Sequence, residues 1–237
     1  MSDTPANRDA FLERCLGHPV FRLRNPDAVE QALAQASSHP QWMLEVKVPV
    51  GRVADVAALT ERGFRVIDTN VQLSRSAAEF SADGVAARHA KPQDEAAVRA
   101  VAATSFSQTR FHLDPRIEKS SADRVKEEWA GNFFSGKRGE WMIVAEDQGR
   151  VAGFLQLLRG VDGSLVIDLV GVLPGSRSKG LGRSMIAFAG QTCLGRAASM
   201  TVGTQVANTG SLRLYENLGF RVSGAWYVLH LHRGDLR

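Results

Sequence analysis

Short apolar runs alternate along the chain with longer segments whose apolar residues recur every three or four positions. The short runs are typical of strands and the longer segments of helices. The first third of the chain is predicted to contain helices at Ala6–Leu16 and Ala28–Ala36, a strand at Leu44–Val48, a helix at Val53–Arg62 and paired strand segments within Phe64–Ser74.

A polar stretch of small residues, Ser76–Gly84, predicts a linker between two domains at residues 1–80 and 83–237. The pattern after it predicts, in order, a strand at Val85–Ala90, a helix from Pro92, a helix at Ala122–Phe134, strands at Trp141–Glu146, Val151–Leu158 and Leu165–Leu173, a helix at Gly182–Arg196, a strand at Met200–Val206, a helix at Thr209–Leu218 and strands at Phe220–Val222 and Trp226–Leu231. This order predicts an α/β (α+β) fold.

The first domain repeats part of the second. At a constant offset and without a gap, Trp42–Arg75 aligns with Ala198–Leu231, so that Gly63-Phe64-Arg65-Val66 falls on Gly219-Phe220-Arg221-Val222. We interpret the N-terminal region as a partial copy of the C-terminal half of the second domain. The alternative is that any strand–helix–strand unit with a glycine after its helix gives a similar alignment.

The copy differs at its polar positions. Arg52, Asp55 and Leu59 stand where the second unit has Asn208, Ser211 and Tyr215. We therefore expect the first unit to be structural, extending a sheet or bordering a neighbouring site.

Composition narrows the class of protein. The chain has 237 residues, 44% of them hydrophobic and 23% charged, with a net charge of +4, and no basic run is interleaved with aromatic residues. We therefore expect small anionic ligands and no nucleic acid. Cys15 and Cys193 have no metal-ligand spacing, so no metal is expected, and they suit a reducing compartment. The polar N-terminus and the lack of a long apolar run predict a cytoplasmic protein with no membrane partner. A homodimer is left open.

The strongest chemical signal is a strand that leads through a glycine-rich, basic loop into a helix. The strand Asp168–Leu173 is followed by Pro174, and the stretch that leads from there into the helix contains three glycines and three basic residues. Free N–H groups and the positive end of the helix dipole would meet there, which favours a phosphorylated cofactor. The spacing does not match a P-loop. The alternative is a tight turn that needs glycine for its backbone alone. The candidate cofactor residues here are Val170, Val172, Arg177, Ser178, Lys179, Gly180, Leu181, Gly182, Arg183 and Ser184.

A second group of polar residues follows on the next helix. Asn208, Ser211 and Tyr215 are spaced by three and four positions, so they share one face or the mouth of that helix. Asn208 is equally suited to cap the helix, and Tyr215 to lie at the edge of a core.

Together these stretches resemble the two signatures of the GCN5-related N-acetyltransferases, the GNAT superfamily. The matching patterns are Arg177-x-x-Gly180-x-Gly182 and Asn208-x-x-Ser211-x-x-x-Tyr215-x-x-x-Gly219-Phe220. The resemblance implies a GNAT fold, with a mixed, mostly antiparallel sheet flanked by helices and a partial GNAT-like unit before it. It also implies acetyl-CoA as cosubstrate, Asn208 holding the pantetheine arm and Tyr215 protonating the leaving thiolate.

The general base is left open. Asp168 is in phase with Val170 and Val172 on the cofactor strand and faces the side where the resemblance places the substrate amine, so it is the first candidate. An aspartate satisfied by backbone or by an arginine is the alternative. His112 is the rival candidate because imidazole titrates near neutral pH, and water relays are also known in the superfamily.

The acceptor is suggested by a closer resemblance to dTDP-fucosamine acetyltransferases. It rests on Ser107-x-x-Arg110-Phe111, on Gly203–Thr209 and on the partial N-terminal unit. It implies an amino group on a nucleotide-linked deoxysugar used for surface polysaccharide, with Phe106, Arg110, Phe111 and His112 as candidate substrate residues. The run His112-Leu113-Asp114 departs from that family, which leaves the sugar open. The alternatives are acetylation of a protein N-terminus, a lysine or a small amine, and a non-catalytic acetyl-CoA-binding module.

Overall fold

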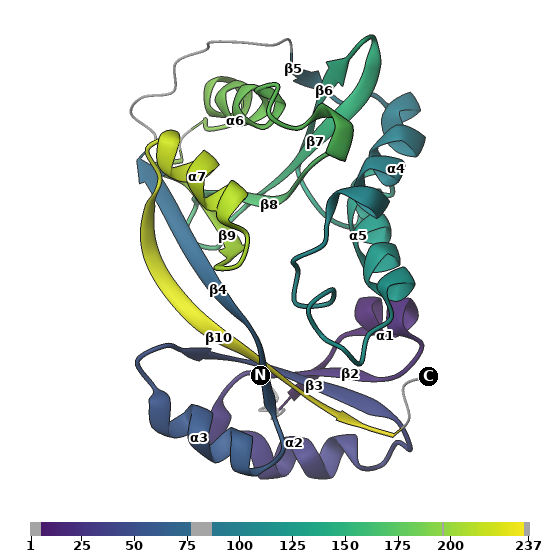
Figure 1. Ribbon diagram of the computed structural model, residues 1–237, viewed down its shortest axis with the longest axis vertical. Helices are drawn as coiled ribbons and strands as arrows, with labels where there is room; N and C mark the ends of the chain where they lie inside the picture. The colour runs from purple at the N-terminus through teal and green to yellow at the C-terminus, as the bar shows by residue number, and fades with distance from the viewer. Residues whose placement is uncertain (1–5, 77–86, 196, 235–237) are drawn as a thin grey trace.

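The computed structural model describes residues 6–76, 87–195 and 197–234, and their strands form one sheet (Figure 1). The strands are β1 (Ala6–Arg8), β2 (Val20–Leu23), β3 (Trp42–Pro49), β4 (Arg65–Ser76), β5 (Ala87–His89), β6 (Trp141–Asp147), β7 (Arg150–Arg159), β8 (Leu165–Val172), β9 (Ser199–Gln205) and β10 (Arg221–Arg233). The α-helices are α1 (Ala10–Leu16), α2 (Val29–Ala36), α3 (Val53–Glu61), α4 (Glu95–Ser105), α5 (Lys119–Phe134), α6 (Leu181–Thr192) and α7 (Thr209–Asn217).

The sheet order is β1-β2-β3-β10-β4-β9-β8-β7-β6-β5, and most neighbours are antiparallel. Only β2–β3 and β8–β9 are parallel pairs among the described strands. The mixed, mostly antiparallel sheet flanked by helices that the sequence predicts is therefore confirmed.

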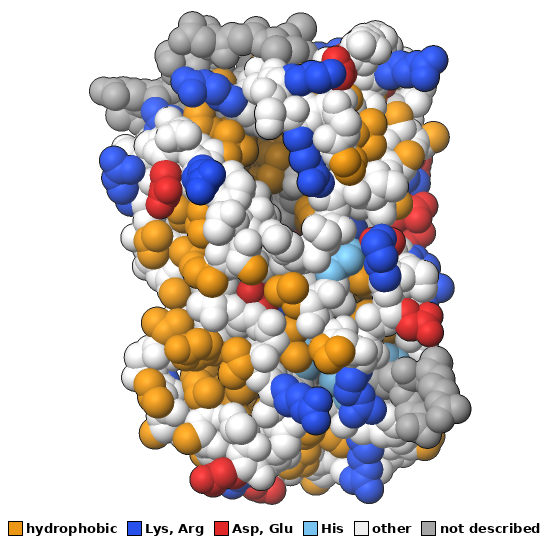
Figure 2. All heavy atoms as spheres, viewed as in Figure 1, with side chains coloured by type: hydrophobic (Ala, Val, Ile, Leu, Met, Phe, Trp, Pro, Cys, Tyr) orange, Lys and Arg blue, Asp and Glu red, His pale blue; other side chains and the backbone are white. Residues whose placement is uncertain are grey.

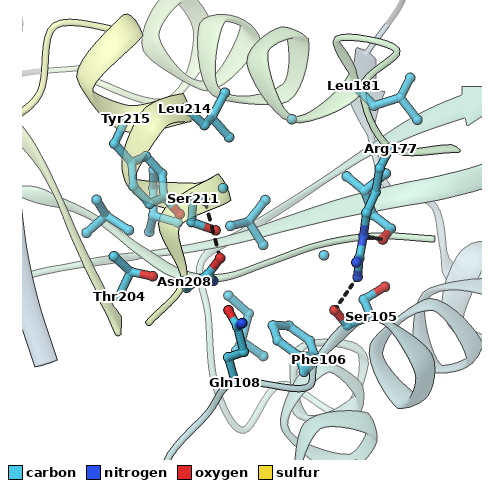
Figure 3. A pocket seen from close by; sticks show the side chains of 18 of the residues that line it. Ser105, Phe106, Gln108, Arg177, Leu181, Thr204, Asn208, Ser211, Leu214 and Tyr215 are labelled. Carbon is cyan, nitrogen blue, oxygen red and sulfur yellow. Dashed lines mark hydrogen bonds between the residues drawn. The ribbon is translucent and has the colours of Figure 1, made fainter. Parts of the chain in front are cut away.

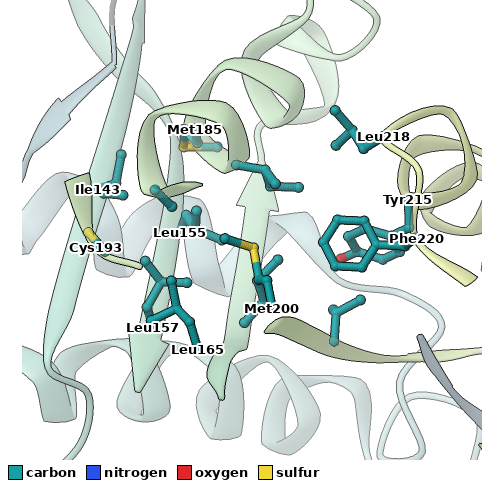
Figure 4. Packing of buried hydrophobic residues seen from close by; sticks show 14 of the residues in the cluster. Ile143, Leu155, Leu157, Leu165, Met185, Cys193, Met200, Tyr215, Leu218 and Phe220 are labelled. Atoms are coloured by element: carbon teal, nitrogen blue, oxygen red, sulfur yellow. The ribbon is translucent and has the colours of Figure 1, made fainter. Parts of the chain in front are cut away.

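Apolar side chains point alternately to the two faces of the central strands, and helices cover both faces of the sheet. Ile143, Leu155 and Leu165 pack with Met185 of α6 on one face (Figure 4). Phe154 and the other residues of the opposite phase pack against α4, which in turn packs on α5. This period of two is what a strand buried on both faces requires.

The repeat found in the sequence has a structural counterpart. The offset that carries residue 42 onto residue 198 also carries α3 onto α7 with identical bounds, and β3 and β4 onto β9 and β10. The pairing obeys the same relation, because Leu229 lies opposite Val46 and the equivalent Leu73 lies opposite Val202. The two units exchange strands: β10 lies between β3 and β4, and β4 lies between β10 and β9.

Because of this exchange, the two units share one continuous sheet. The expected linker and the boundary between residues 80 and 83 fall almost wholly within residues 77–86, outside the described residues. The division into two domains therefore stays a prediction about the sequence. In the structure the two units are joined by the pairing of their strands.

Some element predictions need correction. The predicted helix at Ala6–Leu16 is a short strand, β1, followed by α1, and the strand β2 was not predicted. Both strands are only three or four residues long, too short to give a clear alternation. The paired segments predicted within Phe64–Ser74 form one strand, β4, and the two final predicted strands form β10.

One feature of the sheet opens the site. β8 and β9 pair only from Leu165 opposite Met200 to Ile167 opposite Val202, although both strands continue further. Asp168 is an extra residue at a bulge in the pairing of β8 with β7, since Gln156 faces Leu169 and Leu157 faces Ile167. Beyond this point β8 and β9 diverge, which leaves the backbone groups on the facing edges free to bind a ligand.

Candidate active site

A cavity of about 730 Å³ lies between the diverging ends of β8 and β9. It is bordered by the loop before α6, by α7 and by the segment that follows α4. Figure 2 shows this face of the molecule hollowed in its upper half, with basic side chains beside the hollow.

The loop before α6 forms one end of the cavity. Ser178 and Gly180 have φ of 63° and 80°, and α6 starts at Leu181 with no side chain capping its N-terminus. The first N–H groups of an α-helix have no partner inside the helix, so those of α6 are available to an anion. A Cβ on Gly182 would lie 3.2 Å from Leu214, so glycine also permits close packing of α6 on α7.

The predicted basic residues of this loop differ in where they lie. Arg177 crosses the cavity wall, donating hydrogen bonds to the carbonyl of Ser105 (2.7 Å) and that of Val172 (3.3 Å) (Figure 3). Arg183 is exposed and lines the cavity. Lys179 instead pairs with Asp147 at 2.5 Å.

Most of the predicted cofactor residues border the cavity. Those that line it are Val170, Val172, Arg177, Ser178, Gly180, Leu181, Gly182, Arg183, Asn208 and Ser211. Lys179 is turned to Asp147, and Ser184 is buried in the first turn of α6, so neither lines the cavity.

The helix α7 forms the opposite wall. The Asn208 side chain caps α7 by accepting a hydrogen bond from the Ser211 backbone N–H at 3.2 Å, so its capping role is realised beside the cavity (Figure 3). Tyr215 is one turn further along, 2% exposed, with its ring against Phe220. Burial raises the pKa of the Tyr215 phenol, which therefore stays protonated.

Asp168 lines the cavity on the β8 side, and its carboxylate is held by three side chains. Arg138 donates to both oxygens at 2.6 and 2.7 Å, and Trp129 (2.9 Å) and Gln156 (3.0 Å) donate to one of them. This pairing with an arginine is the alternative to a general base that the sequence leaves open for Asp168. The base role stays a prediction, and it would require these bonds to loosen.

The predicted substrate residues after α4 lie in different surroundings. Phe106 lines the cavity (Figure 3). Phe111 is fully buried in a core with Val125, and the half-buried His112 is hydrogen-bonded to Thr109 and Asp123. Arg110 is paired with Glu45 of β3. The structure therefore keeps these three outside the cavity, and their contact with substrate stays a prediction that needs the segment to move.

A buried ionic network holds this segment to the sheet. Asp114 accepts hydrogen bonds from His230 and His232 at 2.7 Å each, and the other nitrogen of His230 lies 3.4 Å from Glu45. The carboxylates and imidazoles of this network are therefore one another's partners. The N-terminal strand β3 thus helps to hold the segment after α4 that borders the cavity.

Sequence reasoning missed two charged residues of the cavity wall, Arg213 of α7 and Lys126 of α5. Lys126 of α5 lines the cavity and is only 6% exposed. It is in phase with the fully buried Ala122 and Ala130, four positions to either side. A lysine on the apolar face of a helix is the signal that could have found it.

The cavity fits the acetyl-CoA that the predicted signatures imply. The uncapped start of α6 and the cations Arg177 and Arg183 suit a diphosphate. The unpaired edges of β8 and β9 suit an amide-containing arm that completes their hydrogen bonds. Among the described residues, no helix is both long and apolar enough to cross a membrane.

Comparison with known proteins agrees with this fold. The family model for the acetyltransferase (GNAT) family matches residues 103–220, and the chain belongs to this family.

Two curated proteins and a solved structure show how far the likeness extends. Over 145 residues the chain is 32% identical to the spore coat polysaccharide biosynthesis protein SpsD of Bacillus subtilis, a match that covers 61% of this chain and only 50% of that protein. It is 25% identical to dTDP-fucosamine acetyltransferase of Escherichia coli, over 81% of this chain and 82% of that one. The GCN5-related N-acetyltransferase of Sphaerobacter thermophilus has the same fold, with a TM-score of 0.63, 14% identity and coverage of 97% of this chain and 76% of that one.

Proposed function

We propose that the protein transfers the acetyl group of acetyl-CoA to an amino group on a nucleotide-linked deoxysugar of the dTDP-4-amino-4,6-dideoxyhexose type. The observation that carries the proposal is the charge of the cavity. Its described lining includes four basic residues, Lys126, Arg177, Arg183 and Arg213, and one acidic residue, Asp168, which is already paired with Arg138. The three arginines favour ligands that carry phosphate groups, as both substrates of the proposed reaction do.

The relatives support the same class of acceptor. One is a spore coat polysaccharide biosynthesis protein and the other a dTDP-fucosamine acetyltransferase. A role in surface polysaccharide biosynthesis follows from the proposal, and a cytoplasmic location and a homodimer stay predictions.

We assign roles to the residues as follows. The N–H groups at the start of α6, with Arg177 and Arg183, bind the diphosphate of the cosubstrate. The free edge of β8 at Val170 and Val172, with Asn208 and Ser211 opposite, binds the pantetheine arm. A backbone N–H of β8 stabilises the oxyanion. Acetyl-CoA supplies an acetyl group activated as a thioester.

Tyr215 is proposed to donate its proton or a hydrogen bond to the leaving sulfur. Its phenol has a raised pKa, so it is always protonated and available as a donor. An ordinary thiol has a pKa of about 8.5, below that of the phenol, so full proton transfer to the sulfur is uphill. We therefore expect Tyr215 to act mainly by stabilising the developing thiolate through a hydrogen bond.

Cationic acceptors are the main alternative. A polyamine, a lysine side chain or a protein N-terminus would favour an acidic groove, which the described lining does not provide. The remaining alternative is a module that binds acetyl-CoA without turnover.

A panel of amines decides between these alternatives. The protein is incubated with acetyl-CoA and, in turn, dTDP- and UDP-linked amino sugars, a peptide with a free N-terminus, a lysine peptide and spermidine, and products are identified by mass. The proposal expects an added acetyl group on an amino sugar nucleotide. Acetylation of the peptides or spermidine alone would contradict it, and cofactor binding without any product would favour the binding module.

A further inference from the structure

The Lys126 side chain is unusual because it is buried without a partner. It is 6% exposed, lines the cavity, and makes no hydrogen bond or ion pair with any residue in the described parts of the chain. Its Nζ lies instead over three aromatic rings, 4.9 Å from the centroid of Trp129, 5.2 Å from Phe106 and 5.8 Å from Phe111. A buried ammonium is normally paired, so this position needs an explanation.

The charges that face Lys126 explain why it has no counter-ion. Two carboxylates are near enough to interact with it, Asp168 on β8 and Glu45 on β3. Each is already bound by an arginine, Asp168 by Arg138 and Glu45 by Arg110. These charges cancel in pairs, so the lysine remains in an apolar setting with no net negative charge beside it.

This setting favours the neutral amine over the ammonium. Burial, followed by repulsion from Arg110, lowers the pKa of Lys126 to about 7, while Asp168 and Glu45 oppose the change and Arg138 adds to it. The nearby His112 has a lowered pKa and adds no charge. The aromatic rings attract the cation through their faces, so the proton can be held once it arrives. A group that titrates near the working pH and opens onto a reaction cavity is suited to proton transfer.

Resting on the proposed function, we propose that Lys126 is the general base that takes a proton from the ammonium of the acceptor sugar. One N–H bond of the acceptor breaks and one forms on Nζ, giving a free acceptor amine and a lysine ammonium. The amine's lone pair then forms the bond to the acetyl carbon. As the C–S bond breaks, the second proton of the nitrogen passes to the departing sulfur, and Nζ releases its proton to solvent. No oxidant, reductant or other reactant is needed.

Asp168 then has a role other than that of the base. Its oxygens already accept hydrogen bonds from Arg138, Trp129 and Gln156. By holding Arg138 and Trp129, it fixes the ring that lies against Lys126 and leaves the lysine without an anion. We assign it as a positioning residue for Lys126.

Three variants test the proposal in the full chain, with acetyl-CoA and dTDP-4-amino-4,6-dideoxygalactose as the probe. Lys126→Met keeps the length of the side chain, Lys126→Arg keeps a permanent charge that cannot act as a base, and Lys137→Met alters an exposed lysine just beyond α5. We expect both Lys126 variants to lose about 10²-fold or more in kcat/KM for the amine at pH 7. They should also lose the rise in rate around pH 7, with affinity for coenzyme A unchanged. Lys137→Met should match the wild type.

The results distinguish an error in the role of Lys126 from an error in the proposed function. Activity restored in Lys126→Arg would mean that the charge binds an anionic part of the acceptor, which overturns the base role. Unchanged rates and pH profile in Lys126→Met would do the same. A wild-type protein that acetylates none of the panel amines contradicts the proposed function itself. Independently of turnover, NMR titration of the Lys126 side chain in the coenzyme A complex should give a pKa near 7, and a value near 10 would overturn the inference.

Discussion

At the scale of single residues, the site depends on side chains whose contacts decide what each can do. Tyr215 is kept protonated by burial, and Asp168 is held by three donors, whereas Lys126 has no acceptor or counter-ion among the described residues. Residue type alone cannot distinguish these situations, because each results from contacts between distant segments. The sequence patterns predict Tyr215 and Asn208 through their spacing, but Lys126 is visible only as a lysine on the apolar face of its helix.

Replacing Tyr215 with Phe tests its role as a donor. The ring and its packing on Phe220 are kept, and only the hydroxyl is lost. We expect kcat to fall by about 10²-fold or more while the affinity for acetyl-CoA stays nearly constant. Steady-state kinetics and calorimetry measure the two quantities, and an unchanged kcat would remove Tyr215 from the chemistry.

His230 makes the stability of the fold depend on pH. Burial lowers the pKa of His230, but the hydrogen bond to Asp114 and the nearby carboxylate of Glu45 outweigh burial and raise it above its ordinary value of about 6.5. The contribution of protonated His230 to the free energy of unfolding is therefore complete below pH 6.5. It is lost as the pH rises through the pKa of His230 in the folded state.

Urea unfolding of wild type and His230→Gln between pH 6 and 9 measures this contribution. The difference in unfolding free energy between the two should be largest at pH 6 and should shrink as the pH rises. His89→Gln, at an exposed histidine, should show no such trend. A wild-type advantage that is the same at every pH would contradict the assignment.

At the scale of elements, the loop before α6 and the divergence of β8 from β9 together make the cofactor site. The loop and the helix after it could be predicted, because glycines, basic residues and apolar periodicity are all local features. The divergence could not, because it depends on where the pairing of β8 with β9 stops, at Ile167 and Val202. Short strands such as β1 and β2 escaped prediction for lack of alternation.

Gly180→Val tests the loop directly. Gly180 has φ of 80° and open space where a Cβ would lie, so the substitution introduces backbone strain without a clash. A β-branched residue at positive φ costs about 1–2 kcal/mol, so we expect the affinity for coenzyme A to fall about tenfold as the loop shifts. Gly17→Val is the matched control, since Gly17 has φ of 82° and equally open space but caps α1 away from the cavity. Equal affinity in the two variants would contradict the role of the loop.

At the scale of the whole molecule, the exchange of β4 and β10 makes the two sequence units interdependent. The internal repeat could be predicted from the alignment of Gly63-Phe64 with Gly219-Phe220, but the exchange could not, because alignment says nothing about which strands pair. In the structure β10 has no neighbour in the sheet other than β3 and β4, both from the N-terminal unit.

A chain restricted to residues 83–237 should therefore fail to fold, even though it contains both signatures. It would leave β10 without a partner and expose one edge of β9. Circular dichroism and thermal unfolding should show no cooperative transition for this fragment, and co-expression with residues 1–82 should restore one. A stable fragment that binds coenzyme A would show that the exchange is dispensable.

The central claim is that the start of α6 and the free edge of β8 bind coenzyme A, because every assigned role depends on that position. Isothermal titration of the purified protein with coenzyme A tests it most directly. The account predicts one bound molecule per chain, displaced by acetyl-CoA and weakened by Gly180→Val. Titration without any heat of binding up to millimolar coenzyme A would contradict it.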